Sequence, residues 1–386
     1  MKRCLLPWSH MFYHSDGKVY PCCKLVDNEK FTLGESRDSV EKLWNSKVLR
    51  NLRLSFLNDT PTKECIKNCF LSPQPLHTFI DNDILANKDM YFNSTGKDGH
   101  FHENFIVWSI NESNLCNFKC IYCSFKYSTK FYDDLEVKPN TVLLKSFNSL
   151  DQQLSLFKKY SSKIKTIYFA AGESMLQKGY LEMLKNLYEI GNHNVNIHFI
   201  TNLSVLNYEI LNYLNKFNNA TLIASLDTYG ERAEYIRRGT NWNVIETNRK
   251  KLFNYPNIKF MVQSVITNMN VFSLPDFHYD WIEKGFLEKD NLRYYILTSP
   301  EHFFVNVLPA GLKHAAKEKL SKYIEFLSDV EDTETNKMLP KSKIFKILKL
   351  LDSRQKTPIE IFLNKIKQKD NQENLNFLKA FPEFQL

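Results

Sequence analysis

Short apolar runs alternate with stretches of helical periodicity through the middle of the chain, and this alternation constrains the fold more than any other feature. Six runs are rich in Ile, Val, Phe and Tyr, at residues 105–110, 166–171, 195–201, 221–226, 259–267 and 292–297. Five helical patterns lie between them, at residues 150–160, 180–190, 206–217, 244–253 and 274–284. Strands that alternate with helices predict βαβ units and a parallel sheet. The sequence therefore predicts an α/β protein built on a partial (β/α)6 barrel of the TIM type.

Three cysteines follow the first of these runs, in the segment NESNLCNFKCIYCS. They are Cys116, Cys120 and Cys123, and residues that follow barrel strands are the ones that form functional sites. Soft thiolate ligands select iron-sulfur clusters, zinc or copper(I). A [4Fe-4S] cluster held by three cysteines keeps one iron open for an external ligand. The alternative is a structural zinc site, which needs a fourth Cys or His, and residues 125–150 contain neither.

The other five cysteines lie near the start of the chain. Strand-like pieces at residues 11–14 and 18–20 flank a turn at residues 15–17, and such a hairpin would bring Cys4 and Cys22 toward each other. If residues 65–69 are helical, the i, i+4 spacing places Cys65 and Cys69 on one face. Four thiols are then available for one closed site, with one cysteine in excess, and the spacing alone does not decide between Cys22 and Cys23. Four thiolates suit zinc as well as an iron-sulfur cluster.

The loop of three cysteines, with Tyr122 before the last of them, resembles the signature loop of the radical S-adenosylmethionine (radical SAM) enzymes. The resemblance implies that the open iron binds the amino and carboxylate groups of the cofactor's methionine part. Ala171-Gly172-Glu173, after the second run, is similar to the Gly-Gly-Glu motif that holds the methionine amino group in that family. Ala171 replaces the first glycine of the motif.

The same resemblance implies further cofactor contacts at the ends of the later runs. Asn202 ends the third run, Ser225 ends the fourth, and Arg237 follows the fourth. Arg suits a planar carboxylate because it can pair with both oxygens. The backbone near Val265 and Ile266 is expected to flank adenine. No catalytic base or radical-quenching donor is assigned, and Asp227 is named only as a candidate base.

The N-terminal cysteines resemble the auxiliary iron-sulfur module called SPASM, or twitch in its shortened form. The matching elements are Cys4, Gly17-x4-Cys22 and Cys65-x3-Cys69, and the Gly-x4-Cys spacing favours Cys22 over Cys23 as a ligand. The resemblance thus implies a second [4Fe-4S] cluster held by Cys4, Cys22, Cys65 and Cys69. In most relatives the module follows the barrel. Here it precedes the barrel, as in the twitch-domain-containing radical SAM proteins, whose C-x2-P-W and P-C-C elements the chain shows at residues 4–8 and 21–23.

Four segments are expected from these patterns. Residues 1–90 form the small α+β auxiliary module, including a helical pattern at residues 39–54, and residues 91–103 form a linker within a stretch of low periodicity at 71–102. Residues 104–299 form the barrel. Residues 300–386 form a helical extension, with helical patterns at 312–327, 344–351 and 359–366, and they end in residues 381–384, which resemble the ending of the same twitch subgroup.

Charge and composition limit the partners. The net charge is +8, but the lysines are spread along the chain, whereas nucleic-acid domains usually cluster their basic residues. No apolar stretch reaches the ~20 residues of a membrane span, and the opening residues lack a signal peptide's apolar region. The expected setting is cytoplasmic and reducing, with thiols as metal ligands. The resemblance implies an electron donor such as flavodoxin or ferredoxin.

The sequence predicts a radical SAM enzyme that cleaves S-adenosylmethionine to a 5′-deoxyadenosyl radical and takes a hydrogen atom from a substrate. Relatives with such modules suggest a peptide or protein as the substrate, and a sugar-like small molecule is the alternative. A hypothesis of another class is a non-catalytic, metal-bearing module that binds nucleic acid. Only Ala171 and the positive charge support it.

Overall fold

A sheet of nine strands organises the chain, in the order β11-β10-β8-β7-β6-β4-β1-β2-β3. The computed structural model describes residues 4–70, 82–133, 143–297, 299–330, 340–354 and 357–385. The strands are β1 (His10–Tyr13), β2 (Lys18–Tyr20), β3 (Gly34–Glu35), β4 (Val107–Ile110), β6 (Thr166–Phe169), β7 (Asn196–Thr201), β8 (Asn219–Ser225), β10 (Ile258–Ile266) and β11 (Leu292–Ile296). Within the described residues β11 and β3 each have one partner strand, so the sheet is open and does not close into a barrel.

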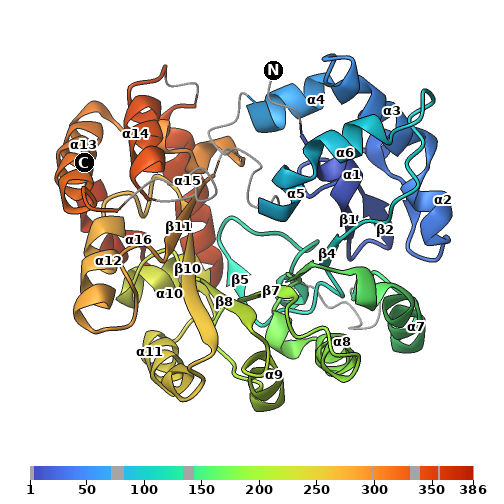
Figure 1. Ribbon diagram of the computed structural model, residues 1–386. Helices are drawn as coiled ribbons and strands as arrows, with labels where there is room; N and C mark the ends of the chain where they lie inside the picture. Colours follow the sequence, from blue (N-terminus) through green and yellow to red (C-terminus); the bar gives the residue numbers. More distant parts are fainter. Residues whose placement is uncertain are drawn as a thin grey trace.

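Six parallel strands match the six predicted runs to within two residues at each end, which confirms the predicted α/β class and its parallel sheet. Neighbouring pairs from β4 to β11 are all parallel. The helices between them are α7 (Leu150–Tyr160), α8 (Lys178–Glu189), α9 (Tyr208–Leu214), α10 (Gly230–Ile236), α11 (Trp242–Lys251) and α12 (Leu274–Glu283). Side chains of Ser149, Asn207 and Asn241 accept hydrogen bonds from the first turns of α7, α9 and α11, which fixes where these helices begin. Figure 1 shows α7, α8, α9 and α11 along one face of the sheet.

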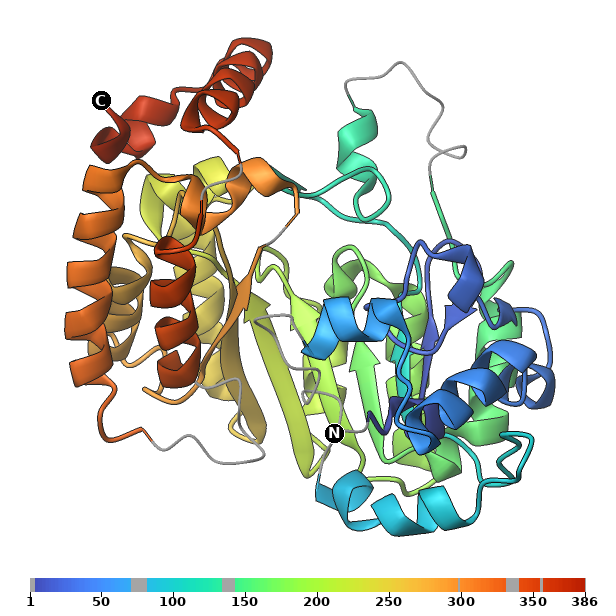
Figure 2. The same ribbon diagram turned by 90° about the horizontal axis from the view of Figure 1, so that it is seen from above.

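The auxiliary segment shares the sheet of the barrel. Strand β1 pairs in parallel with β4, with His10 opposite Val107 and Tyr13 opposite Ile110. The predicted hairpin is confirmed, since β1 pairs antiparallel with β2. Figure 2 shows these N-terminal elements at one end of the sheet and the C-terminal helices at the other. The boundary predicted near residue 90 therefore does not interrupt the hydrogen-bonded sheet.

The helical pattern at 39–54 is confirmed but interrupted, and the expected linker contains helices. The helical pattern at 39–54 is two helices, α2 (Val40–Trp44) and α3 (Lys47–Leu57). Asn45 ends the first because its side-chain oxygen accepts hydrogen bonds from the backbone of Phe101 and from Arg53, and Ser46 caps the second. The expected stretch without periodicity contains α5 (Asn82–Ala86) and α6 (Lys88–Asn93), while residues 71–81 lie outside the described residues.

The remaining N-terminal helices are short. Helix α1 (Leu6–Ser9) precedes β1, and α4 (Lys63–Cys65) continues into a π-helical turn, Ile66–Phe70. Cys65 and Cys69 thus lie on helical backbone as predicted, although the turn between them is wider than an α-helical one. A π-helical turn in place of an α-helical one is frequent at functional sites.

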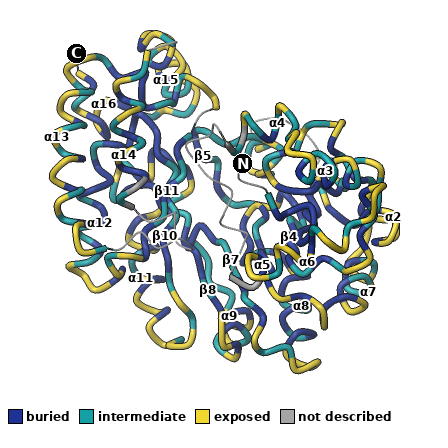
Figure 3. Tube along the Cα trace, turned by 45° about the horizontal axis from the view of Figure 1, so that its top comes forward, coloured by how far each residue is buried: buried dark blue, intermediate teal, exposed yellow. Residues whose placement is uncertain are grey.

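The three predicted C-terminal helices are confirmed, as α13 (Ala310–Phe326), α14 (Pro340–Leu351) and α15 (Ile359–Glu373), followed by α16 (Phe377–Ala380). Tyr323 of α13 contacts Tyr294 of β11 and His278 of α12 through its hydroxyl. Glu383 pairs with both terminal nitrogens of Arg232 on α10, at 2.7 and 2.9 Å. Figure 3 shows the strands mostly buried and the helices exposed on their outer sides. No helix in the described part of the chain is long and apolar enough to cross a membrane.

Candidate metal and cofactor site

The loop of three cysteines is held against the sheet by a second, two-stranded ladder. Strand β5 (Lys119–Cys120) pairs antiparallel with β9 (Arg237–Arg238), with Cys120 opposite Arg237. The hydroxyl of Ser128 donates to the backbone oxygen of Phe118 at 2.6 Å, which closes the far side of the loop. The backbone that carries the cysteines is therefore fixed from two directions.

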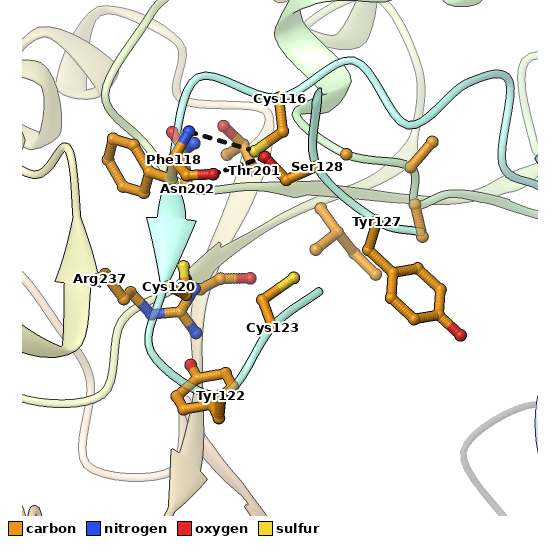
Figure 4. Close-up of a pocket in the computed structure, with 15 residues that line it drawn as sticks. Cys116, Phe118, Cys120, Tyr122, Cys123, Tyr127, Ser128, Thr201, Asn202 and Arg237 are labelled. Atoms are coloured by element: carbon orange, nitrogen blue, oxygen red, sulfur yellow. Dashed lines mark hydrogen bonds between the residues drawn. The ribbon is translucent and has the colours of Figure 1, made fainter. Parts of the chain in front are cut away.

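All three thiols face one cavity of about 240 Å³ at the carboxyl ends of the parallel strands. Cys116, Cys120 and Cys123 line it together with Tyr122 from the same loop, and Figure 4 shows Arg237 lying between Cys120 and Tyr122. Strands β6, β7 and β8 complete the wall with Ala170, Ala171, Gly172, Ile200, Thr201, Asn202 and Ser225. The structure thus brings together most of the residues that the sequence placed in one site.

The thiols are in a low-dielectric setting. Burial raises the pKa of Cys116 and of Cys123 to about 12, and it also raises the pKa of Cys120, although the nearby Arg237 acts in the opposite direction. Metal binding would displace the thiol protons, because the thiolate is the ligand. Among the described residues, no three His, Cys, Asp or Glu side chains converge as the ligands of one metal ion would. Three soft donors spread around one cavity fit a [4Fe-4S] cluster with three protein ligands.

Gly172 lies where the backbone of two loops meets. Its φ is +30°, and a Cβ atom there would lie 2.2 Å from the backbone oxygen of Leu115. Only glycine avoids that contact, so Ala171-Gly172 approaches the cysteine loop without a side chain between them.

Glu173 does not line the cavity. Its side chain is fully buried, and it accepts hydrogen bonds from the hydroxyl of Thr201 at 2.6 Å, from the backbone of Asn202 at 2.6 Å and from the backbone of Met175 at 2.9 Å. Burial raises the pKa of Glu173 to about 6, against the lowering effect of these donors. In this arrangement Glu173 fixes the end of β7, and a contact to the cofactor remains a prediction.

Arg237 is paired with Asp227 within the protein. Its Nε lies 2.9 Å from one Asp227 oxygen and its Nη2 lies 3.0 Å from the other. The hydroxyl of Tyr122 donates to the same carboxylate, as does the backbone N–H of Val265, at 2.8 Å. Burial alone would lower the pKa of Arg237, but the Asp227 carboxylate outweighs it and raises the pKa. Asp227 is therefore a structural counter-ion rather than a free candidate base.

The pairing leaves Arg237 with limited capacity for a ligand. Its Nη1 is 4.0 Å from the sulfur of Cys120 and is not used by Asp227. Among the other predicted contacts, Asn202 and Ser225 line the cavity, whereas Val265 and Ile266 do not. Asn202 also donates to Asn117 of the cysteine loop at 2.9 Å, so it links the loop to β7.

The auxiliary thiols lie near one another. Cys22 is buried and Cys23 is exposed. Burial raises the pKa of Cys22, and the charges of Cys23, Cys4 and Cys69 raise it further. Burial likewise raises the pKa of Cys69, with added effects of Cys4 and Cys65. Cys22 and Cys69 are thus each close enough to Cys4 to be affected by its charge, and the ligand set remains a prediction.

Sequence reasoning missed several residues of the cavity wall. Phe118, Tyr127 and Ser128 belong to the cysteine loop, and Ile200 belongs to β7. Their positions in the sequence, within five residues of a predicted ligand or strand end, were the available signal. His10, in the N-terminal segment, is a buried packing residue. His10 lies 2.9 Å from the backbone oxygen of Pro21 and 2.8 Å from the hydroxyl of Ser109.

Comparisons with known proteins agree with this geometry. A model of the radical SAM superfamily matches residues 110–271, and a model of the SPASM iron-sulfur cluster-binding domain matches residues 4–70. The comparison with curated proteins gives no match.

Solved structures similar to this chain include anSMEcpe with bound AdoMet, at 18% identity and a TM-score of 0.43, which covers 58% of this chain and 60% of that one. Streptococcus suis SuiB bound to S-adenosylmethionine matches at 14% identity with a TM-score of 0.44, over 64% of this chain and 53% of that one. This chain thus spans less than two thirds of either protein.

The matched residues include the three-cysteine loop, the strand ends around its cavity and the N-terminal cysteines. For the family, the loop implies a [4Fe-4S] cluster and S-adenosylmethionine, and the N-terminal domain implies an auxiliary iron-sulfur cluster. The chain carries a radical SAM domain at residues 110–271 and an N-terminal iron-sulfur cluster-binding domain of the SPASM type at residues 4–70.

Proposed function

We propose that this protein uses S-adenosylmethionine and one electron to take a hydrogen atom from a peptide or protein substrate. The observation that carries the proposal is the single cavity on which Cys116, Cys120 and Cys123 meet the carboxyl ends of three parallel strands. Bound to the open iron of a three-cysteine cluster and reduced by one electron, S-adenosylmethionine would supply methionine and a 5′-deoxyadenosyl radical.

The chain's own residues prepare the cavity for such a ligand. Gly172 lets backbone approach the cysteine loop, and Arg237 keeps its positive charge because Asp227 is beside it. The Nη1 of Arg237, which Asp227 does not use and which lies 4.0 Å from the sulfur of Cys120, is then available to a carboxylate at the cavity. Tyr122 ties the loop to Asp227 through its hydroxyl, so the position of Cys123 depends on this buried pair.

A peptide substrate is favoured by the SPASM-type domain at residues 4–70, because enzymes with related modules often modify ribosomally made peptides. The net charge of +8 suits an acidic partner. All eight cysteines lie in the described residues and are free thiols, which supports a reducing compartment such as the cytoplasm. The electron would come from an external donor such as flavodoxin or ferredoxin.

The test is 5′-deoxyadenosine release by anaerobically reconstituted protein with S-adenosylmethionine and dithionite. We expect release by the wild type, and a fall of at least a hundredfold in Cys123→Ser, while Cys23→Ser, which changes an exposed thiol, stays within twofold. Peptide pools should stimulate the release more than sugar alcohols do. Equal release from wild type and Cys123→Ser would contradict the proposed chemistry, and stimulation by sugar alcohols alone would contradict the peptide.

A further inference from the structure

Basic and aromatic side chains line the face of the sheet that carries the cofactor cavity. Ile200 and Ser225 line the cavity, and successive residues of a strand alternate between faces. His198, two residues before Ile200, therefore shares its face, and Tyr168 is the register partner of His198. Ser225 is opposite Gln263, and Gln263 is opposite Arg293. Arg293 thus lies on this inner face, in the same row as a residue of the cavity wall.

The opposite face of the same strands is packed by helices. Phe199, next to His198, contacts Tyr180 of α8, with ring centroids 6.1 Å apart. Tyr294, next to Arg293, contacts Tyr323 of α13 through its hydroxyl. The interiors of TIM-type barrels are filled mostly by Val, Ile and Leu. An arginine and a histidine in this position therefore require an explanation other than packing.

Arg293 has no acceptor within the described residues. None of its guanidinium nitrogens makes a hydrogen bond or an ion pair there, and its Nε is buried without a partner. Burial lowers the pKa of Arg293, and the groups whose charges oppose this are Tyr168 and Tyr295, not a carboxylate. Arg293 is half-buried, and a partly desolvated cation without a partner is costly unless a ligand supplies the missing anion.

His198 also has a buried nitrogen without a hydrogen-bond partner in the described residues. Its Nδ1 is buried without a partner, and its ring stacks on Tyr168 with centroids 4.4 Å apart. Burial, with a smaller contribution from the charge of Arg293, lowers the pKa of His198 to about 3. His198 is therefore a neutral hydrogen-bonding group, close enough to Arg293 to be affected by its charge.

A third cation approaches from the edge of the sheet. Lys343 of α14 is 1% exposed, its amino group donates to the backbone oxygen of Tyr294, and it lies 5.1 Å from the ring centroid of Tyr295. Burial, with smaller contributions from the charges of Lys346, Arg293 and Lys24, lowers the pKa of Lys343 to about 7. In the part of the chain that the structure describes, no carboxylate is among the groups that act on Arg293, His198 or Lys343.

We propose that Arg293, with His198 and Lys343 beside it, receives a carboxylate of the substrate on the inner face next to the cofactor cavity. A guanidinium pairs with both oxygens of a carboxylate, and a peptide offers this group as an Asp or Glu side chain or as its C-terminus. The inference rests on the proposed function, because it places the carboxylate beside the site of hydrogen abstraction.

Binding of matched short peptides tests this inference without turnover. The probes are three peptides and inorganic phosphate. N-acetyl-Ala-Glu-Ala-amide has a side-chain carboxylate, N-acetyl-Ala-Gln-Ala with a free C-terminus has a terminal carboxylate, and N-acetyl-Ala-Gln-Ala-amide has neither. Each is titrated calorimetrically into the anaerobic, reconstituted full chain with S-adenosylmethionine present. We expect wild type to bind one or both acidic peptides at least tenfold more tightly than the neutral amide. The stronger of the two acidic peptides identifies a side-chain or a terminal carboxylate.

Variants assign the preference to Arg293. Arg293→Gln should reduce the preference for acidic over neutral peptides below threefold, and Arg293→Lys should keep part of this preference. Arg37→Gln is the matched control and should keep it in full, because Arg37 is exposed and pairs with Glu35. The comparison of Glu and Gln peptides on wild type does not depend on how any variant folds.

Four results would overturn the inference. The first is equal binding of acidic and neutral peptides by wild type, and the second is an unchanged preference for acidic peptides in Arg293→Gln. The third is tighter binding of phosphate than of either acidic peptide. The fourth is a loss of S-adenosylmethionine affinity in Arg293→Gln while the preference for acidic peptides stays intact. The last result would assign Arg293 to the cofactor's own carboxylate. Wild type that releases no 5′-deoxyadenosine but prefers acidic peptides would contradict the proposed function and support the binding site.

Discussion

Glu173 is buried behind the cavity, and its protonation is coupled to the stability of the fold. The pKa of this carboxyl is raised by burial from its ordinary 4.5 to about 6. The folded state therefore holds the proton more tightly than the unfolded chain does, and the stabilisation by the protonated form is lost as the pH rises from about 4.5 through about 6. The difference of about 1.5 pKa units corresponds to about 2 kcal/mol.

Glu173→Gln should remove this contribution to the pH dependence. We expect the free energy of urea unfolding of wild type to fall by about 2 kcal/mol more than that of Glu173→Gln between about pH 4.5 and pH 7. Measuring both proteins in the same buffers cancels the titration of all other groups. Parallel pH profiles would show that Glu173 titrates as it does in the unfolded chain.

Gly172 offers a second test at the scale of one residue, with a matched control. Gly172→Ala should displace the cysteine loop, because the added Cβ would meet the backbone oxygen of Leu115, and the iron content should fall by at least half. Gly191 also has a positive φ, of +76°, but its Cβ would meet nothing within 4 Å. Gly191→Ala should therefore cost about 1 kcal/mol of stability and leave the iron content unchanged. Equal iron contents in the two variants would contradict this account of the loop.

Arg53 holds several elements of the N-terminal segment together. It is fully buried and donates to the backbone oxygens of Pro7, Trp44 and Gly99. Arg53→Leu leaves these acceptors unsatisfied and should lower the free energy of unfolding by about 3 kcal/mol. Arg37→Leu, at an exposed ion pair, should change it by less than about 0.5 kcal/mol. Equal losses in urea unfolding would show that the buried bonds of Arg53 contribute little.

Elements with strong periodicity could be predicted from the sequence, and those decided by single tertiary contacts could not. Each of the six apolar runs overlaps a strand, and α7 spans the predicted residues, Leu150–Tyr160. The break between α2 and α3 within the pattern at 39–54 could not be predicted, because it depends on a hydrogen bond between Asn45 and Phe101, which is 56 residues away. No local pattern reports such a contact.

The same distinction holds for the site. The cysteines, Ala171-Gly172 and the strand ends could be predicted because motif spacing and strand order place them at one edge of the sheet. The pairing of Arg237 with Asp227, and the inward turn of Glu173, depend on bonds between different strands. Arg293 and His198 lie within strand patterns that sequence reasoning treats as core, so their unpaired nitrogens become visible only in the structure.

At the scale of the whole molecule, the auxiliary segment and the barrel share one sheet. Strand β1 covers the edge of β4, and Tyr13 packs on Trp108 with ring centroids 5.3 Å apart. A chain of residues 104–386 alone should therefore expose an unpaired strand edge and aggregate. Size-exclusion chromatography and circular dichroism would check this. A monomeric, folded fragment would show that the auxiliary segment is an independent domain.

The central claim is that two iron-sulfur clusters are present and that only one of them has an open iron. The most direct test is iron and sulfide analysis with low-temperature EPR of anaerobically reconstituted wild type and of Cys116→Ala/Cys120→Ala/Cys123→Ala. The account predicts about eight irons in wild type and about four in the triple variant. It also predicts an EPR signal that S-adenosylmethionine changes in wild type alone. Zinc in place of iron, or a wild-type signal that does not respond to S-adenosylmethionine, would contradict it.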